Sequence, residues 1–301
     1  MSGDLEAARA LVAEAEAHDG VSPVSDQALL AAARGQRELF TPPEALGILG
    51  QGEVDLVVRP EARGRGLGTA LLTQMLESAD DGDGGELRAW SHGENPAAEA
   101  LLGGAGFAPI RTLYRLALDP ALLPGDDRDP LALPVPDGYV LRAFDPESPA
   151  DAAAWVRANA AAFAHHPEQG RITEADFALM REEPWFDAAD LILLAEDGPG
   201  SEIAGSTWIK TVPAKDGSRT GEPNDGAAVE TELYAVGVRP EHAGRGLGGL
   251  LLDATLARMA QHHPSRVTLY VDGDNEAALK LYARVGFTID QRSTQWARSG
   301  A

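Results

Sequence analysis

The 301-residue sequence contains no cysteine, few positive charges and no long apolar run. The absence of cysteine excludes disulfide bonds, thiolate metal sites and a cysteine nucleophile. No apolar run reaches the roughly 18 residues of a membrane-spanning helix, and the acidic start MSGDLEAARA lacks the apolar core of a signal peptide. The 25 Lys and Arg residues face 47 Asp and Glu residues, a formal net charge of −22. Because nucleic acids and anionic membranes need clustered basic residues, we expect a cytoplasmic protein that binds neither.

Residues 120–136, PALLPGDDRDPLALPVP, contain five prolines and a cluster of charges. Such a density of proline is incompatible with a packed helix or central strand and is typical of an extended linker. A chain of this length has room for two domains of about 150 residues each. We therefore predict an N-terminal domain over residues 1–132 and a C-terminal domain over residues 137–301, in a monomeric protein. The adjacent histidines His165 and His166 have no partners at metal-ligand spacing, and no metal is expected.

The hydrophobic pattern alternates between helical and strand periodicity in both halves. Short apolar runs bounded by glycine or polar turns predict strands, and Gly50-Gln51-Gly52 predicts a hairpin. These elements indicate an α/β fold (α+β, with a mixed, mainly antiparallel sheet flanked by helices) in each domain. The predicted helices are residues 5–17, 27–33, 96–104, 151–163, 172–181, 246–260 and 276–285, and the predicted strands are residues 46–49, 54–58, 87–90, 112–118, 139–143, 191–196, 203–211, 230–238 and 267–271.

Residues 236–252, VGVRPEHAGRGLGGLLL, read as strand, glycine-rich loop and helix. Gly244, Gly246 and Gly248 let the backbone approach a ligand closely, and the helix that follows directs unpaired N–H groups and the positive end of its dipole toward it. Such a helix start suits a phosphate group. The nearby Arg239 and Arg245 are expected to make the local field positive, as are Arg59, Arg63 and Arg65 at a second loop.

That second loop belongs to an internal repeat. Residues 57–72, VVRPEARGRGLGTALL, align with residues 237–252 at a shift of 180 positions, with 11 of 16 residues identical. The same shift places Asn95 on Asn275 and Phe107 on Phe287. Two segments that keep one register this far indicate a duplication, so the two predicted domains are related.

These loops resemble the signature of the GCN5-related N-acetyltransferase (GNAT) family, in which Arg or Gln, two residues, Gly, one residue and Gly or Ala stand between a strand and a helix. The first copy matches from Arg63 to Gly68, whereas the second has Ala243 at the Arg or Gln position. The resemblance implies that the loops hold the pyrophosphate of acetyl-coenzyme A, the co-substrate. Asn275 has two interpretations, the N-cap of the last helix or a cofactor contact. The cofactor-binding residues implied are Val236, Gly237, Val238, Ala243, Gly244, Arg245, Gly246, Leu247, Gly248, Gly249, Asn275, Glu276, Ala277, Ala278, Leu279 and Lys280 in the second copy, and Leu56, Val57, Val58, Gly64, Arg65, Gly66, Leu67, Gly68 and Thr69 in the first.

The two copies differ at the positions where the chemistry of acetyl transfer is expected. At the 180-residue shift Glu232 stands opposite Gly52, and Tyr282 stands opposite Leu102. By resemblance to the family, Glu232 is the general base and Tyr282 the acid that protonates the leaving thiolate. The second domain is therefore predicted to be catalytic and the first not. Glu230, two residues before Glu232 on the same strand face, is the rival base; the alternative roles are a surface ion pair for Glu232 and sheet packing for Tyr282.

The chain as a whole resembles a narrower group within the family, the tandem acetyltransferases of mycothiol synthesis. The residues that carry this resemblance include HPEQG at 166–170, WFD at 185–187 and LYVDGDNEAALKLYARVGF at 269–287. The resemblance implies transfer of acetyl to the cysteinyl amine of a cysteinyl-glucosaminyl-inositol, whose hydroxyls and cationic amine suit carboxylates and a lysine. The acceptor contacts it implies are Asp26, Glu168, Lys210, Glu232 and Tyr270.

Other interpretations of the acceptor residues and of the function remain open. Asp26 also fits a helix cap, Glu168 a plain loop carboxylate and Lys210 a surface ion pair. A different acceptor, such as an aminoglycoside or a protein N-terminus, is the enzymatic alternative. A coenzyme A sensor without turnover is the alternative from another class, and the first domain taken alone fits that description.

Overall fold

The computed structural model describes residues 2–80, 85–164, 169–198, 202–214 and 228–300. The chain forms two compact units, and each unit is discontinuous in sequence. Unit 1 consists of Met1–Tyr114, Asp272–Asn275 and Asp290–Ala301. Unit 2 consists of Arg115–Val271 and Glu276–Ile289.

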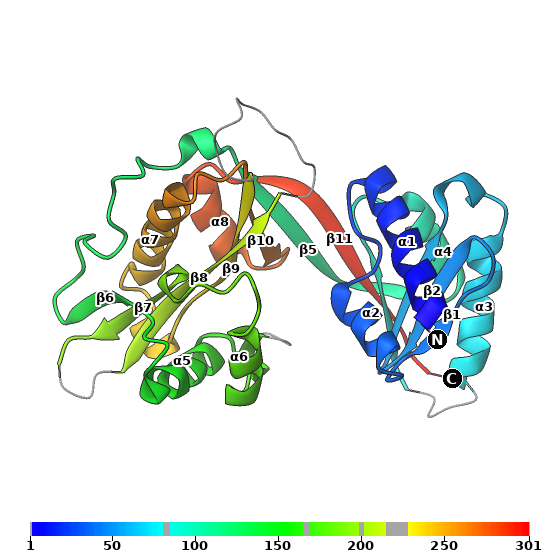
Figure 1. Ribbon diagram of the computed structural model, residues 1–301, viewed down its shortest axis with the longest axis horizontal. Coiled ribbons are helices and arrows are strands. Elements are labelled where there is room, and N and C mark those ends of the chain that lie inside the picture. The colour runs from blue at the N-terminus through cyan, green and yellow to red at the C-terminus, as the bar shows by residue number, and fades with distance from the viewer. Residues whose placement is uncertain (1, 81–84, 165–168, 199–201, 215–227, 301) are drawn as a thin grey trace. The chain divides into compact units, whose positions relative to one another are not determined.

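Unit 1 is a mixed sheet covered by helices on both faces (Figure 1). Its strands lie in the order β1-β2-β3-β4-β11-β5. The pairs β1–β2, β2–β3 and β4–β11 are antiparallel, and β3–β4 is parallel. Its elements are α1 (Ser2–Asp19), α2 (Asp26–Ala33), β1 (Glu38–Phe40), β2 (Ala45–Gly50), β3 (Glu53–Val58), α3 (Leu67–Asp80), β4 (Leu87–Ser91), α4 (Pro96–Gly104), β5 (Ala108–Leu118) and β11 (Thr288–Arg298).

Local sequence signals explain how several of these elements begin and turn. Gln51 and Gly52 both have positive φ angles, 56° and 76°, between β2 and β3. This is the two-residue turn whose twist matches paired antiparallel strands, and it confirms the predicted hairpin. Ser25 caps α2 by accepting a hydrogen bond from the backbone N–H of Ala28. Asp26 is therefore the first residue of the helix and not its cap.

Unit 2 repeats the architecture, with strands in the order β5-β10-β9-β8-β7-β6. The pairs β6–β7, β7–β8 and β8–β9 are antiparallel, and β9–β10 is parallel. A β-bulge interrupts β8–β9: Trp208 pairs with Ala235 and Ile209 with Leu233, so Tyr234 has no partner across the ladder. The remaining elements are β6 (Tyr139–Ala143), α5 (Pro149–Ala162), α6 (Glu174–Met180), β7 (Leu191–Glu196), β8 (Ile203–Pro213), β9 (Val229–Val238), α7 (Leu247–Gln261), β10 (Arg266–Asp272) and α8 (Glu276–Arg284).

The two faces of the unit 2 sheet are covered differently. Helices α5 and α6 pack an aromatic cluster on one face, where the ring of Trp208 meets those of Trp155, Phe177 and Trp185. Helix α7 covers the other face with Leu247 and with further apolar residues along its length (Figure 1). Because strand side chains alternate between faces, the face with Trp208 also carries the polar residues described below.

The compact units do not follow the predicted sequence boundaries. Strand β11 lies at the C-terminus, yet from Asp290 onward it belongs to unit 1, where it pairs with β4. Strand β5 passes from unit 1 into unit 2 after Tyr114. A pattern within one segment does not report which strand a neighbour pairs with, so sequence alone predicts two consecutive domains. The predicted repeat boundaries, 1–132 and 137–301, describe the duplication and stay a prediction.

The fold class predicted from sequence is confirmed, and two strands were missed. Strand β1 is only three residues long, and β11, TIDQRSTQWAR, is polar along most of its length. The predicted linker contains no α-helix or β-strand, only a single 3₁₀ turn at Pro120–Leu122.

Candidate functional site

The glycine-rich loop of unit 2 joins the end of β9 to the first turn of α7. Gly244 and Gly246 have φ angles of 77° and 78°, a left-handed conformation that favours glycine. A side chain added at either position would meet no atom within 4 Å. The loop surface is therefore open, and the free N–H groups of the α7 start are available to an anion. Unit 1 repeats this geometry at Gly64 and Gly66, with φ angles of 74° and 82°.

The structure qualifies the expectation that five arginines near the loops make the local field positive. Arg63 makes two hydrogen bonds of 2.7 Å to Asp19, and Arg59 lies 2.7 Å from Glu14. Arg239 pairs with the carboxylates of Glu202 and Glu241. Arg65 donates to the carbonyl of Glu61, and Arg245 donates to the Tyr139 hydroxyl at 2.7 Å. Since carboxylates neutralise three of the five, the helix N-termini supply more of the local positive potential than the sequence suggests.

The parallel strands β9 and β10 part beside the loop. Their paired residues run from Glu230 with Arg266 to Leu233 with Leu269, although both strands continue beyond that point. Parting of this kind leaves backbone groups of β9 available to a ligand. The residues predicted to bind the cofactor at this end of β9, including Gly237 and Val238, lie beyond the last pair. In unit 1 the corresponding pairing ends at Val54 with Ala89.

Glu232 lies one residue before the point where the strands part, on the face that carries the aromatic cluster. Its cross-strand partner on β8 is Lys210. Burial raises the pKa of Glu232 above its ordinary value of 4.5, and the positive charges of Lys210 and Arg115 oppose this rise. Tyr270 on β10 accepts a hydrogen bond from Arg115 and is also near Glu232. The structure thus brings together three predicted residues, Glu232, Lys210 and Tyr270, with one that was not predicted.

Trp185 is a further neighbour that the sequence interpretation did not assign a role. The Nζ atom of Lys210 lies 5.1 Å from the centre of the Trp185 ring, within the range of a cation–π interaction. The ring also packs against Tyr234, with centroids 5.5 Å apart. Its motif, WFD, was a signal in the sequence, but the contact with Lys210 arises only through the pairing of β7 with β8. No sequence motif indicated Arg115, because only the order of the strands in the sheet places this residue near Glu232.

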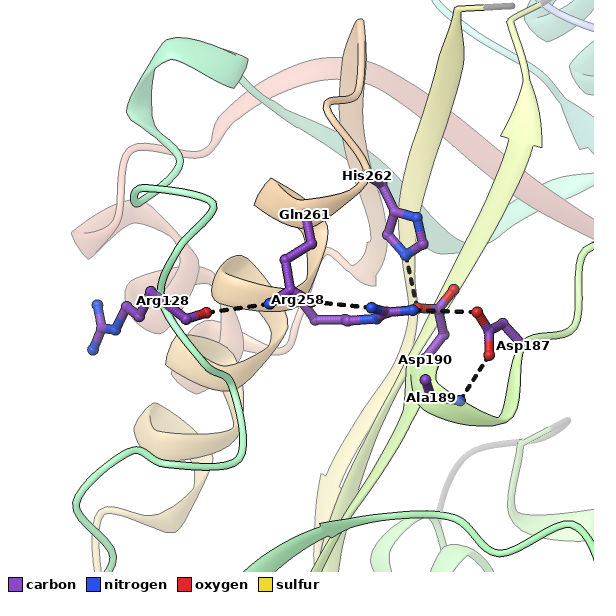
Figure 2. Close-up of polar contacts among 7 residues, drawn as sticks. All are labelled: Arg128, Asp187, Ala189, Asp190, Arg258, Gln261 and His262. Carbon is purple, nitrogen blue, oxygen red and sulfur yellow. Dashed lines mark hydrogen bonds and ion pairs between the residues drawn. The ribbon is translucent and has the colours of Figure 1, made fainter. Parts of the chain in front are cut away.

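Two aspartates hold the segment after Trp185 against the end of α7 (Figure 2). Asp190 is completely buried and accepts hydrogen bonds of 2.7 Å from both Arg258 and His262. Arg258 also reaches Asp187 at 3.2 Å. A buried carboxylate needs such partners, because an unpaired charge in the interior is costly. We call Asp187, Asp190, Arg258 and His262 the α7 latch.

Tyr282 lies on α8, with only 7% of its surface exposed. Burial raises the pKa of its hydroxyl to about 12. The ring packs edge-on against Phe287 at 5.9 Å between centroids. Tyr282 is therefore neutral over the physiological range, and its catalytic role stays a prediction.

The remaining predicted residues are Asp26, Glu168, Asn275 and Glu230. Glu168 lies outside the described residues, and the side chain of Asp26 at the start of α2 is likewise not described. Asn275 directly precedes α8, and its counterpart Asn95 caps α4 by accepting from the N–H of Ala98. Glu230 lies two residues farther than Glu232 from the parting of the strands. The acceptor contacts assigned to Asp26 and Glu168 stay predictions.

The sheet register corrects the comparison of the two copies. Glu53 of β3 pairs with Arg88, whereas Glu232 of β9 pairs with Thr268, the residue 180 positions after Arg88. Because the bulge at Tyr234 adds one residue to β9, Glu53 and not Gly52 occupies the position of Glu232. Arg37 binds Glu53 at 3.2 Å and Asp55 at 2.6 Å. The first copy thus has a carboxylate at this position, and an arginine holds it.

None of the helices in the described residues is long and apolar enough to cross a membrane. The described part of the chain contains no group of three or more His, Asp or Glu side chains arranged to hold a metal ion. The expected cytoplasmic location stays a prediction.

Known proteins similar to this chain agree with the geometry of the loops. The acetyltransferase (GNAT) family matches residues 38–107 and 155–287. A protein of Sanguibacter keddieii named mycothiol acetyltransferase is 38% identical over 99% of this chain and 94% of its own length. Another of that name, from a Nocardioides species, is 41% identical over 95% of each chain.

Solved structures show the same fold. A tandem GNAT protein from the clavulanic acid biosynthesis pathway is similar with a TM-score of 0.65 and 22% identity, over 100% of this chain and 96% of that one. A GCN5-related N-acetyltransferase from Sphaerobacter thermophilus has the same TM-score and identity, over 100% and 95%. The chain belongs to the acetyltransferase (GNAT) family and contains two regions of the family fold in tandem.

Proposed function

We propose that this acetyltransferase transfers the acetyl group of acetyl-coenzyme A to the cysteinyl amine of cysteinyl-glucosaminyl-inositol, the last step of mycothiol synthesis. The observation that carries the proposal is the relationship to mycothiol acetyltransferases over almost the whole chain. The polar group around Glu232 supports it, because a carboxylate beside a lysine and a tyrosine suits an acceptor with a cationic amine and many hydroxyls.

Acetyl-coenzyme A binds to unit 2 in this proposal. The N–H groups from Gly244 to Gly248 receive its pyrophosphate at the start of α7, and the open space above both glycines admits it. Its acyl arm follows β9 where that strand leaves β10. The N–H of Val238 or a neighbour then polarises the thioester carbonyl as negative charge develops on the oxygen. The first turn of α8, from Glu276 to Lys280, contacts the remainder of the cofactor.

Glu232 acts as the general base, directly or through a water molecule. An acceptor ammonium must lose a proton before its nitrogen can attack the thioester, and a carboxylate with a raised pKa is better matched to that proton than an ordinary one. Lys210 binds an acceptor hydroxyl, and Trp185 holds the lysine in place. Tyr270 is a further acceptor contact in this proposal, and the contacts assigned to Asp26 and Glu168 stay predictions.

Tyr282 assists departure of the thiolate. Its pKa of about 12 exceeds the roughly 8.5 of a thiol. The phenol is therefore a hydrogen-bond donor to the developing thiolate, and complete proton transfer from Tyr282 to the thiolate is uphill. Loss of this hydroxyl is expected to lower kcat more than it raises KM.

The proposal is tested by incubating the purified protein with acetyl-coenzyme A and the cysteinyl-glucosaminyl-inositol amine and detecting the acetylated product by mass. Glu232→Gln and Tyr282→Phe are each expected to lower kcat about 10²-fold or more. Glu230→Gln is the matched control, with the same change on the same strand face, and is expected to stay within about threefold of wild type. Acetylation of an aminoglycoside or peptide N-terminus but not of this amine would refute the acceptor. Binding of coenzyme A without any turnover would leave the sensor interpretation.

Unit 1 is proposed to bind acetyl-coenzyme A without turning it over. Its loop has the same left-handed glycines, while Arg37 holds Glu53, the counterpart of the proposed base. Equilibrium titration is expected to give two sites in wild type and one in either Gly66→Trp or Gly246→Trp. Only Gly246→Trp should abolish turnover. A single site in wild type that Gly246→Trp removes would refute binding in unit 1.

A further inference from the structure

Arg115 reaches the unit 2 site from a strand that lies before the linker in sequence. Residues 115–118 of β5 belong to unit 2, and β5 lies beside β10 in its sheet. By the 180-residue shift, the counterpart of Arg115 is Gln295 on β11. Gln295 pairs with Trp90 of unit 1, and the counterpart of Trp90 is Tyr270. The duplication therefore places Arg115 opposite Tyr270, and the hydrogen bond from Arg115 to Tyr270 agrees with that placement.

Arg115 lies on the opposite side of Glu232 from Lys210. Lys210 is the partner of Glu232 on β8, while Arg115 comes from β5, on the far side of β10. Arg115 acts electrostatically on both Glu232 and Tyr270. A carboxylate half-buried in the sheet thus has a positive charge on each side, and one of them comes from the first repeat. In unit 1 the counterpart of Arg115 is the uncharged, buried Gln295.

We infer that Arg115 is a positioning residue for acetyl transfer in unit 2, holding the Tyr270 hydroxyl in the acceptor site and setting the charge around Glu232. The inference rests on the proposed function, which assigns Glu232 as the base. It goes further by making the last strand of the non-catalytic repeat part of the catalytic site.

The pH dependence expected of this arrangement follows from the charged groups around Glu232. Among the described residues these are Lys210 on β8, Arg115 on β5, the neutral phenol of Tyr270 and the guanidinium of Arg266 on β10, and Glu230 on the same strand as Glu232. The side packed by α5 and α6 presents the uncharged ring of Trp185. Burial raises the pKa of Glu232, and Arg115 lowers it. Removing Arg115 therefore raises the pKa of Glu232 further. As the pH falls, the variant loses the carboxylate form, which a base needs, at a higher pH than wild type does.

The first test compares the pH profile of kcat/KM for wild type, Arg115→Gln and Arg115→Lys with the full chain. Arg115→Gln is expected to move the acid limb up by about one pH unit. Its kcat/KM should therefore be roughly tenfold below that of wild type at pH values below the limb, and this difference should become smaller toward high pH. Arg115→Lys keeps the positive charge and should leave the acid limb in place. The acceptor KM should rise, because the planar guanidinium group that donates to the Tyr270 hydroxyl is lost. Arg157→Gln, an exposed arginine on α5, is the matched control and should change neither value.

A second variant and a second readout keep the test decisive. Tyr270→Phe removes the hydrogen-bond partner without altering β5 and should raise the acceptor KM with the affinity for acetyl-coenzyme A unchanged. Carboxyl carbon NMR of glutamate-labelled protein, with the Glu232 signal assigned by its loss in Glu232→Gln, follows the titration of Glu232 without substrate. A Glu232 titration that is the same in wild type, Arg115→Gln and Arg115→Lys would overturn the inference.

The two proposals fail in different ways. A wild-type protein that does not acetylate the amine, with a Glu232 titration that still shifts in Arg115→Gln, would refute the proposed acceptor and leave the placement of Arg115 intact. A uniform loss of activity at every pH in Arg115→Gln, with no shift in the Glu232 titration, would show a merely structural role and overturn the inference alone.

Discussion

At the scale of single residues, Glu232 shows how its proposed function and the stability of the fold oppose each other. Burial makes its ionised form unfavourable, and Lys210 and Arg115 offset only part of that effect, so the net pKa is raised. A group whose folded-state pKa lies above its unfolded value binds protons more tightly when folded. Its contribution to stability is therefore present at low pH and is lost as pH rises through the folded-state value.

The sign of this linkage predicts the effect of Glu232→Gln on stability. Because the amide carries no charge to desolvate, the variant is expected to be more stable than wild type at pH 8, by about 1 kcal/mol, while being catalytically impaired. Below the unfolded-state pKa the difference should vanish. Urea denaturation at pH 4 and pH 8 measures the stability difference from wild type at each pH, with Glu230→Gln as the control. A variant less stable than wild type at pH 8 would contradict the raised pKa.

Gly246 carries a second prediction at this scale, based on its backbone. Its φ angle of 78° is unfavourable for any residue with a Cβ, although no atom lies nearby to clash. Gly246→Ala is expected to lower the free energy of unfolding by about 1 kcal/mol and to weaken acetyl-coenzyme A binding in unit 2. The identical substitution Gly66→Ala should cost similar stability and leave turnover unchanged. Calorimetric titration and steady-state kinetics distinguish the two, and equal loss of turnover in both variants would count against a catalytic unit 2.

At the scale of elements, helix α7 connects the two halves of the proposed site in unit 2. Its first turn follows the glycine-rich loop, and near its other end Arg258 binds Asp187 and Asp190, just after Trp185 (Figure 2). The Trp185 ring in turn meets Lys210. The α7 latch therefore fixes the aromatic side of the proposed acceptor site relative to the helix that is proposed to bind the cofactor.

Arg258→Met tests the α7 latch. It leaves the buried Asp190 with His262 as its remaining described side-chain partner, and we expect the free energy of unfolding to fall by about 3 kcal/mol. The acceptor KM should rise while the Kd of acetyl-coenzyme A changes little, because the loop lies at the other end of α7. Arg157→Met, exposed on α5, should alter neither. A rise in the cofactor Kd as large as that in the acceptor KM would argue for general loosening of α7.

At the scale of the whole chain, the repeats exchange their last strands. Strand β5 of the first repeat contributes residues 115–118 to unit 2, and β11 of the second repeat contributes most of its length to unit 1. Neither unit is therefore a continuous segment. This arrangement gives a physical reason for the first repeat to persist even without turnover of its own, as proposed, since its strand completes the sheet of the proposed catalytic unit.

A truncation tests whether unit 2 depends on β5 of the first repeat. A fragment of residues 137–301 lacks β5, so β10 becomes an exposed edge and Arg115 is absent. We expect it to aggregate or to show no cooperative unfolding, because an unpaired central strand invites association. A longer fragment, residues 105–301, restores β5 and should be more soluble. Circular dichroism, solubility and turnover compare the two with the full chain, and a folded, active 137–301 fragment would refute the dependence.

Local sequence alone determined the loops, the repeat and most of the elements. Alternation of apolar residues, the prolines of the linker and the glycines before α7 act over a few residues, so they can be recognised without a structure. The resemblance to known acetyltransferases, and not these local patterns, pointed to Glu232, Lys210 and Tyr270 as acceptor contacts. The tertiary structure decided what depends on contacts between distant segments: the exchange of β5 and β11, the bulge at Tyr234 that makes Glu53 the counterpart of Glu232, the pairing of loop arginines with carboxylates, and the arrival of Arg115 beside Tyr270. Strand order and register depend on packing over the whole sheet, and no single segment encodes them.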